Sequence, residues 1–144
     1  MRLAAYPAST AMATPMTSDP LVIAERDNEG SHRLFVPETE WVQMEGFPRG
    51  VRYVGEDPIE YGVFSGFREE WEGWRAVVER CLDAGESFVA LGFYEGTYKS
   101  TGRSVRAEFA HLIEFEDGRI VRFVQYTDTF KVAKAMGAVE GETP

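Results

Sequence analysis

The chain has 144 residues and a mass of 16.2 kDa; 44% of its residues are hydrophobic and 27% are charged, a composition that excludes a disordered or fibrous chain and predicts one globular domain. Fifteen Lys and Arg against 24 Asp and Glu give a net charge of −9, so nucleic acid is not an expected partner. No stretch approaches the roughly 20 apolar residues of a membrane span, so no membrane association is expected. The single cysteine, Cys81, cannot form an internal disulfide and fits a cytoplasmic location.

Residues 1–19 are rich in Ala, Ser, Thr, Pro and Met and predict a disordered leader. A secretory signal is an alternative, but Pro7 interrupts its apolar run. Met16 is a second candidate start. Asp19 and Pro20 are typical of a helix N-terminus, so we expect one domain over residues 20–137, beginning with a short helix, and a disordered tail over 138–144.

Trp41 to Met44 reads as a strand that leads into a Gly-Phe-Pro-Arg-Gly turn and a second short extended piece. A helix is predicted to follow, with Asp57 as its N-cap. Its buried face is indicated by apolar residues at intervals of three and four: Ile59, Val63, Phe64, Phe67 and Trp71.

Beyond Gly73 the apolar pattern has a period of two, which predicts four strands joined by hairpins. The strands are Trp74–Leu82, Ser87–Tyr98, Ser104–Glu116 and Arg119–Phe130. One helical turn is predicted over Lys131–Met136, with Gly137 at its C-cap position. The fold class is therefore α+β, a curved antiparallel sheet closed by N-terminal helices into a cone.

Alternation identifies which side chains face the inside of this cone. In Ser104–Glu116, the apolar face carries Phe109 and Ile113 and includes one imidazole, His111. In Ser87–Tyr98, Tyr94 shares a face with small residues that suit a wall approached by a ligand. The opposite apolar face predicts a homodimer through the outer side of the sheet.

The order of Thr101-Gly-Arg, Phe109-Ala-His, Asp117-Gly-Arg-Ile and Phe123-Val-Gln-Tyr-Thr-Asp-Thr resembles the SnoaL-like group of the nuclear transport factor 2-like superfamily. Glu45-Gly-Phe-Pro and Tyr53-Val-Gly resemble the same group. The superfamily also contains ketosteroid isomerases, polyketide cyclases and limonene-epoxide hydrolases. The resemblance covers about residues 35–137 and implies the cone fold, also called a cystatin-like roll.

The resemblance implies His111 and Asp128 as a catalytic acid–base pair. Gln125 stands where the epoxide hydrolases have an acid, and the other two triad positions, near Gly92 and Tyr94, are unmatched, so that reaction is not expected. Gln43 stands at the ketosteroid isomerase base, and Glu45 is the nearest carboxylate. The expected ligand-binding residues are Trp41, Gln43, Glu45, Phe64, Tyr94, Phe109, Phe123 and Gln125.

Each assignment has a structural alternative. His111 can be a core histidine bonded to Asp128 or Gln125, and Asp128 an N-cap of the last helical turn. Glu45 can lie in a solvated loop, and the aromatic residues can be packing residues.

Three functions remain open. The first is an isomerase, cyclase or lyase that acts without a cofactor or metal on a small hydrophobic carbonyl compound. The second is a non-catalytic binding protein for a small apolar ligand, and the third is a dimeric interaction module.

Overall fold

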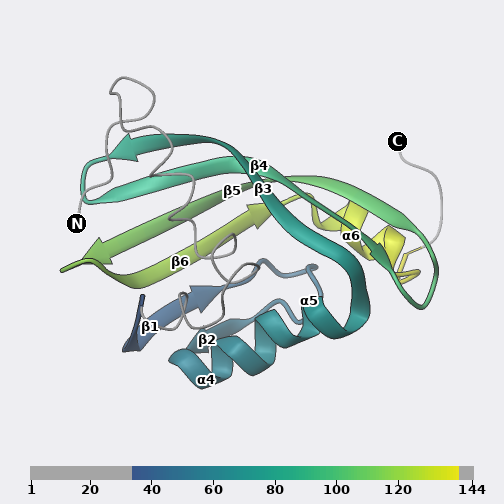
Figure 1. Ribbon diagram of the computed structural model, residues 1–144, viewed down its shortest axis with the longest axis horizontal. Coiled ribbons are helices and arrows are strands. Elements are labelled where there is room, and N and C mark those ends of the chain that lie inside the picture. The colour runs from purple at the N-terminus through teal and green to yellow at the C-terminus, as the bar shows by residue number, and fades with distance from the viewer. Residues whose placement is uncertain (1–33, 140–144) are drawn as a thin grey trace.

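Six strands form one curved, mixed sheet in the computed structural model, which describes residues 34–139 (Figure 1). Their order across the sheet is β2-β1-β6-β5-β4-β3. The sheet is open rather than closed on itself. The strands are β1 (Phe35–Val42), β2 (Arg52–Val54), β3 (Trp71–Ala84), β4 (Ser87–Tyr98), β5 (Ser104–Glu116) and β6 (Arg119–Thr127).

Strands β3 to β6 form the predicted meander of antiparallel hairpins. The β5–β6 turn places Asp117 and Gly118 at φ of 50° and 76°, the left-handed pair that a tight two-residue hairpin requires. Strands β4 and β5 have the predicted bounds, whereas β3 begins three residues earlier and ends two residues later. The prediction that β6 continues to Phe130 is wrong, because α6 (Thr129–Ala135) begins there.

The first strand departs from an all-antiparallel sheet. β1 pairs with β2 in antiparallel fashion but lies parallel to β6. Thr39, which is fully buried, donates its hydroxyl to the carbonyl of Ile120 at 2.5 Å. The strand ends at Val42, so Gln43 and Met44, predicted within it, belong to the following loop.

A helix of three contiguous segments lies against one side of the sheet: α4 (Glu56–Ile59), the π-helical η1 (Glu60–Phe64) and α5 (Ser65–Glu70). Gly55 is the N-cap, with φ of 91°, so the prediction of Asp57 as N-cap is wrong. Ile59, Val63 and Phe64 of the predicted apolar face are buried and Phe67 is partly buried, whereas Trp71 belongs to β3 and not to the helix. Phe64 contacts the Trp41 ring at 5.3 Å between centroids, which fixes the helix on the inner side of the sheet.

The inner face of β5 is the predicted one. Val105, Ala107, Phe109, His111, Ile113 and Phe115 are all buried. On β4, Ala90 and Gly92 pair with His111 and Phe109 and share that face. A side chain at Gly92 would meet the backbone carbonyl of Val77 at 1.9 Å. Gly92 therefore allows the close approach of the β3 backbone and does not make room for a ligand.

The opposite, outer face carries an unbroken apolar row across five strands. Phe93 and Val124 are buried on this side but are not part of the main core cluster. The row follows from the strand register and consists of Leu82, Val89, Leu112, Val124 and Val42.

The expected leader, the short helix after Pro20 and most of the expected tail lie outside the described residues. Every helix within residues 34–139 is too short or too polar to traverse a bilayer.

Candidate functional site

Three polar side chains meet on the inner face, one from each of the strands β4, β5 and β6. The Tyr94 hydroxyl lies 2.6 Å from Nε2 of His111, and the Gln125 amide nitrogen donates to the Tyr94 oxygen at 3.0 Å. All three residues are 0% exposed. We call Tyr94, His111 and Gln125 the inner polar cluster.

Aromatic rings surround the cluster. The Phe109 ring stacks on the His111 imidazole at 3.8 Å with an interplanar angle of 1°. Phe123 lies 4.7 Å from the same imidazole and 3.7 Å from the Trp41 ring. The cluster is shielded from solvent, so the hydrogen bond between Tyr94 and His111 is screened less than one at the surface.

The loop after β1 is attached to the cluster. The Met44 amide donates to Oε1 of Gln125 at 3.2 Å, which also fixes the orientation of the Gln125 amide. Phe47, from the same loop, is 3% exposed and its ring lies 5.9 Å from that of Tyr94. The loop therefore covers the cluster, and access to Tyr94 requires Phe47 to move.

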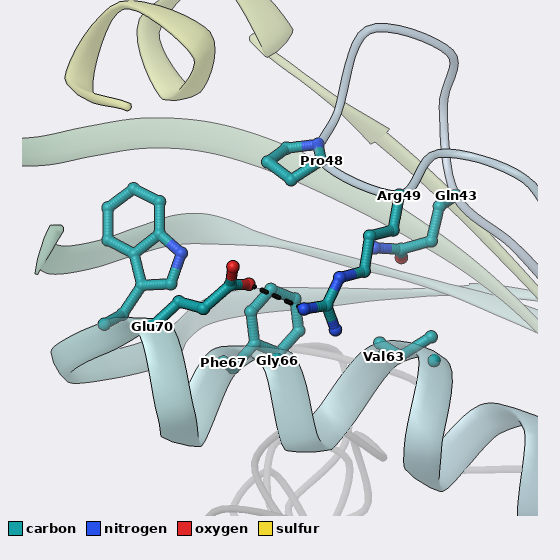
Figure 2. Close-up of a pocket in the computed structure, with 9 residues that line it drawn as sticks. Gln43, Pro48, Arg49, Val63, Gly66, Phe67 and Glu70 are labelled. Atoms are coloured by element: carbon teal, nitrogen blue, oxygen red, sulfur yellow. Dashed lines mark hydrogen bonds and ion pairs between the residues drawn. The ribbon is translucent and has the colours of Figure 1, made fainter. Parts of the chain in front are cut away.

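A small, shallow pocket, partly open to solvent, lies between this loop and α5 (Figure 2). Gln43, Arg49 and Glu70 supply its polar lining, and Val63, Phe67 and Trp71 much of its apolar lining. Nη2 of Arg49 lies 3.0 Å from Oε1 of Glu70. The pocket therefore combines a cation, an anion and an amide beside apolar side chains, which is the usual make-up of a small-molecule site.

Arg49 occupies a backbone conformation that favours glycine. Its φ is 58°, at the third position of a turn in which the Gly50 amide donates to the Phe47 carbonyl at 2.8 Å. The Tyr53 hydroxyl donates to the Arg49 carbonyl at 2.8 Å. Burial raises the pKa of Tyr53, so this hydroxyl stays protonated as a donor.

The predicted catalytic pair is not brought together. His111 is fully buried and bonds to Tyr94, whereas Asp128 is exposed and its Oδ1 accepts from the Lys131 amide at 3.2 Å. Asp128 is the N-cap of α6, which was its structural alternative. Gln125 lies opposite His111 in the sheet but bonds to Tyr94.

The predicted ligand residues fall into three groups. Tyr94, Phe109, Phe123 and Gln125 surround or form the inner polar cluster, with Trp41 and Phe64 stacked beyond it. Gln43 lines the open pocket, and its Oε1 accepts from Nε1 of Trp41 at 3.0 Å. Glu45 is exposed in the loop.

Sequence reasoning missed Arg49 and Glu70. They are 21 residues apart and their pairing depends on the packing of a loop against a helix. The one signal was the Phe-Pro-Arg-Gly turn, because an arginine after proline in such a turn takes a position that glycine usually fills.

Comparison with known proteins identifies the family. The sequence model of the SnoaL-like domain matches residues 21–123. The chain belongs to the SnoaL-like family. No curated protein matches the chain in sequence.

Solved structures share the fold of this SnoaL-like chain. A nuclear transport factor 2-like protein of Burkholderia thailandensis is 36% identical, with a TM-score of 0.79 over 85% of this chain and 95% of that one. TerC, crystallised with polyporic acid, is 22% identical, with a TM-score of 0.71 over 87% and 95%. A Shewanella denitrificans protein, provisionally assigned as a SnoaL-like polyketide cyclase, is 12% identical, with a TM-score of 0.68 over 88% and 97%.

Proposed function

We propose that this SnoaL-like protein catalyses an isomerase-, cyclase- or lyase-type proton transfer on a small apolar carbonyl compound, with the inner polar cluster as the acid–base group. The observation that carries the proposal is the 2.6 Å contact between the Tyr94 hydroxyl and His111 Nε2 on a dry, aromatic face. Membership of a family that includes cyclases and isomerases supports the same reading.

The chemistry requires a base near an acidic C–H and a donor for the enolate oxygen. In the proposal, the Tyr94–His111 bond opens when the substrate enters. His111 Nε2 then takes the proton from the C–H bond and later returns it to the product. The Tyr94 hydroxyl donates to the enolate oxygen, and Gln125 holds the Tyr94 oxygen in place. Phe47 moves aside to admit the substrate. Asp128 acts as a helix cap and has no part in the reaction.

The experiment compares wild type, Tyr94→Phe and Asp128→Asn in a thermal-shift screen against hydrophobic ketones, enones and polyketide-like aromatics, with mass spectrometry of each mixture. Ligands that bind the folded state raise its melting temperature. Wild type and Asp128→Asn should convert the bound compound, and Tyr94→Phe should not. Equal conversion by all three proteins would overturn the assignment, and stabilisation without conversion would support a non-catalytic binding protein.

A second proposal concerns the outer face, which we infer is a homodimer interface. The apolar row through Leu112 and Val124 supports it, because apolar sheet faces of this breadth usually meet another element. Charged pairs flank the row on both sides. Arg75 pairs with Glu95 at one end, and Arg122 with Glu114 at the other, at 3.4 Å. An apolar centre with a charged rim is typical of a subunit interface.

A further inference from the structure

The pocket beside Arg49 has hydrogen-bond donors that no side chain among the described residues uses. A guanidinium carries five N–H groups, and among residues 34–139 its side-chain partner is Glu70, through Nη2. The side chains of Arg49 and Glu70 are 43% and 35% exposed. Ion pairs with that exposure contribute little to stability, so the pair can open readily.

Gln43 adds a donor with a fixed orientation. Nε1 of Trp41 donates to Oε1 of Gln43 at 3.0 Å, so the amide nitrogen is the end left for the pocket. Nε2 has no hydrogen-bond partner in the part of the chain that the structure describes. Figure 2 shows the amide end of Gln43 directed toward the Arg49 side chain.

The backbone holds Arg49 in an unusual conformation beside the pocket. A left-handed conformation is unfavourable for a non-glycine residue. Gly66 makes room for the side chain, because a Cβ there would lie 2.4 Å from Nη1 of Arg49. Residues held in strained backbone conformations cluster at functional sites.

We propose that this pocket binds the carboxylate of a small organic acid. One carboxylate oxygen accepts from the Arg49 guanidinium and the other from the Gln43 amide, while the body of the acid lies against Phe67 and Trp71. Arginine matches a planar carboxylate better than any other side chain. The pocket is shallow and open on one side, so in this proposal the carboxylate enters it and the rest of the acid lies across its mouth.

Glu70 is the competitor in this arrangement. Its carboxylate occupies one donor of Arg49 in the empty protein, and the incoming acid replaces or joins it. Removal of the Glu70 charge should therefore tighten binding, and removal of the Arg49 guanidinium should abolish it. These opposite changes in affinity distinguish a specific carboxylate site from nonspecific binding to the surface.

The test measures binding of sodium benzoate, with benzamide as the neutral analogue, by chemical-shift titration at about 0.15 M ionic strength, where charges farther than about 8 Å are screened. Wild type should bind benzoate and not benzamide. Arg49→Gly should lose at least about tenfold in affinity, about 1.4 kcal/mol, yet melt at the same or a higher temperature because glycine suits the backbone. Glu70→Gln should bind benzoate several-fold more tightly.

Three results would overturn the site: equal binding of benzoate and benzamide, unchanged benzoate affinity in Arg49→Gly, or weaker binding in Glu70→Gln. The inference concerns a separate site and does not require acid–base chemistry at the inner polar cluster. Tyr94→Phe should bind benzoate as wild type does. The absence of turnover in the compound screen would therefore not contradict the carboxylate site. The absence of benzoate binding would not contradict the proposed reaction.

Discussion

Tyr94 and His111 share a short hydrogen bond although they are not opposite each other in the sheet. His111 is paired with Ala90, and Tyr94 with Ala107. The Tyr94 side chain therefore extends along the inner face, past Phe109, whose ring lies 4.6 Å away, to reach the imidazole. The cluster thus depends on the register of the β4–β5 hairpin.

Replacement of Tyr94 by Phe tests how much that hydrogen bond contributes to the free energy of unfolding. The variant keeps the ring but removes the hydroxyl, which leaves His111 Nε2 and the Gln125 amide without this partner. A buried polar group left unsatisfied costs about 1–3 kcal/mol, and the free energy of unfolding in urea should fall by that amount. The matched control is Tyr126→Phe, at an exposed position on β6, which should change stability little. An unchanged midpoint for Tyr94→Phe would contradict the assigned bond.

Gly92 is predicted to be a structural requirement of the sheet. A methyl group there would overlap the Val77 carbonyl, and overpacking of this kind costs about 1–3 kcal/mol or more. Gly118, at φ of 76° with open space around it, is the control, because Gly118→Ala introduces backbone strain alone. Thermal unfolding should show the larger loss for Gly92→Ala, and the reverse order would show that Gly92 has room for a side chain.

Glu40 links stability to pH. Hydrogen bonds from Arg52 and then Arg122 lower the pKa of Glu40 below 4.5. The ionised form is therefore favoured in the folded state. This contribution is present above the unfolded pKa and is lost as the pH falls through the folded value. Urea midpoints between pH 7 and pH 3 should fall more steeply for wild type than for Glu40→Gln. Glu38→Gln, at an exposed position on the same strand, should follow wild type.

Asp128 is expected to act through the helix that it caps. Asp128→Ala removes the acceptor for the Lys131 amide and should cost about 1 kcal/mol, whereas Asn keeps a capping oxygen and should cost little. Circular dichroism during denaturation measures both. A large loss of activity in Asp128→Asn with unchanged stability would instead restore Asp128 to a catalytic role.

The proposed homodimer is tested at Leu112, in the middle of the outer apolar row. A charge there should be tolerated by the fold, because the side chain is only half-buried, but not by an interface. Light scattering after size exclusion should show a dimer for wild type at micromolar concentration and a monomer for Leu112→Glu. Tyr61→Glu, at an exposed helical position, should remain dimeric. A monomeric wild-type protein at that concentration would contradict the proposed homodimer.

Local pattern was enough to predict the meander and the inner face of β5. Alternation in β5 favours one orientation, because the inner face is apolar apart from His111, whereas the outer face carries Arg106, Glu108 and Glu114 as well as Leu112. In β6 both faces carry apolar residues, and both are indeed packed: Phe123 faces the inner core and Val124 the outer row. Its orientation was therefore unreadable from the sequence.

Pairings between segments that are distant in the chain could not be predicted from the sequence. The parallel contact of β1 with β6 joins residues about 80 positions apart, as in the bond from Thr39 to Ile120. The Tyr94–His111 bond needs the hairpin register, and the Arg49–Glu70 pair needs the loop docked on α5. The catalytic prediction for Asp128 came from the family resemblance, whereas its distance from His111 depends on where β6 ends, at Thr127.

The parallel pairing of β1 also sets an order of assembly. The hairpins of β3 to β6 form from neighbouring segments, whereas β1 has no partner on its β6 side until the last strand is in place. Closing so long a stretch of chain is slow compared with forming hairpins. During synthesis on the ribosome the first described strand must therefore wait for the last, and its edge stays exposed to other chains throughout that interval.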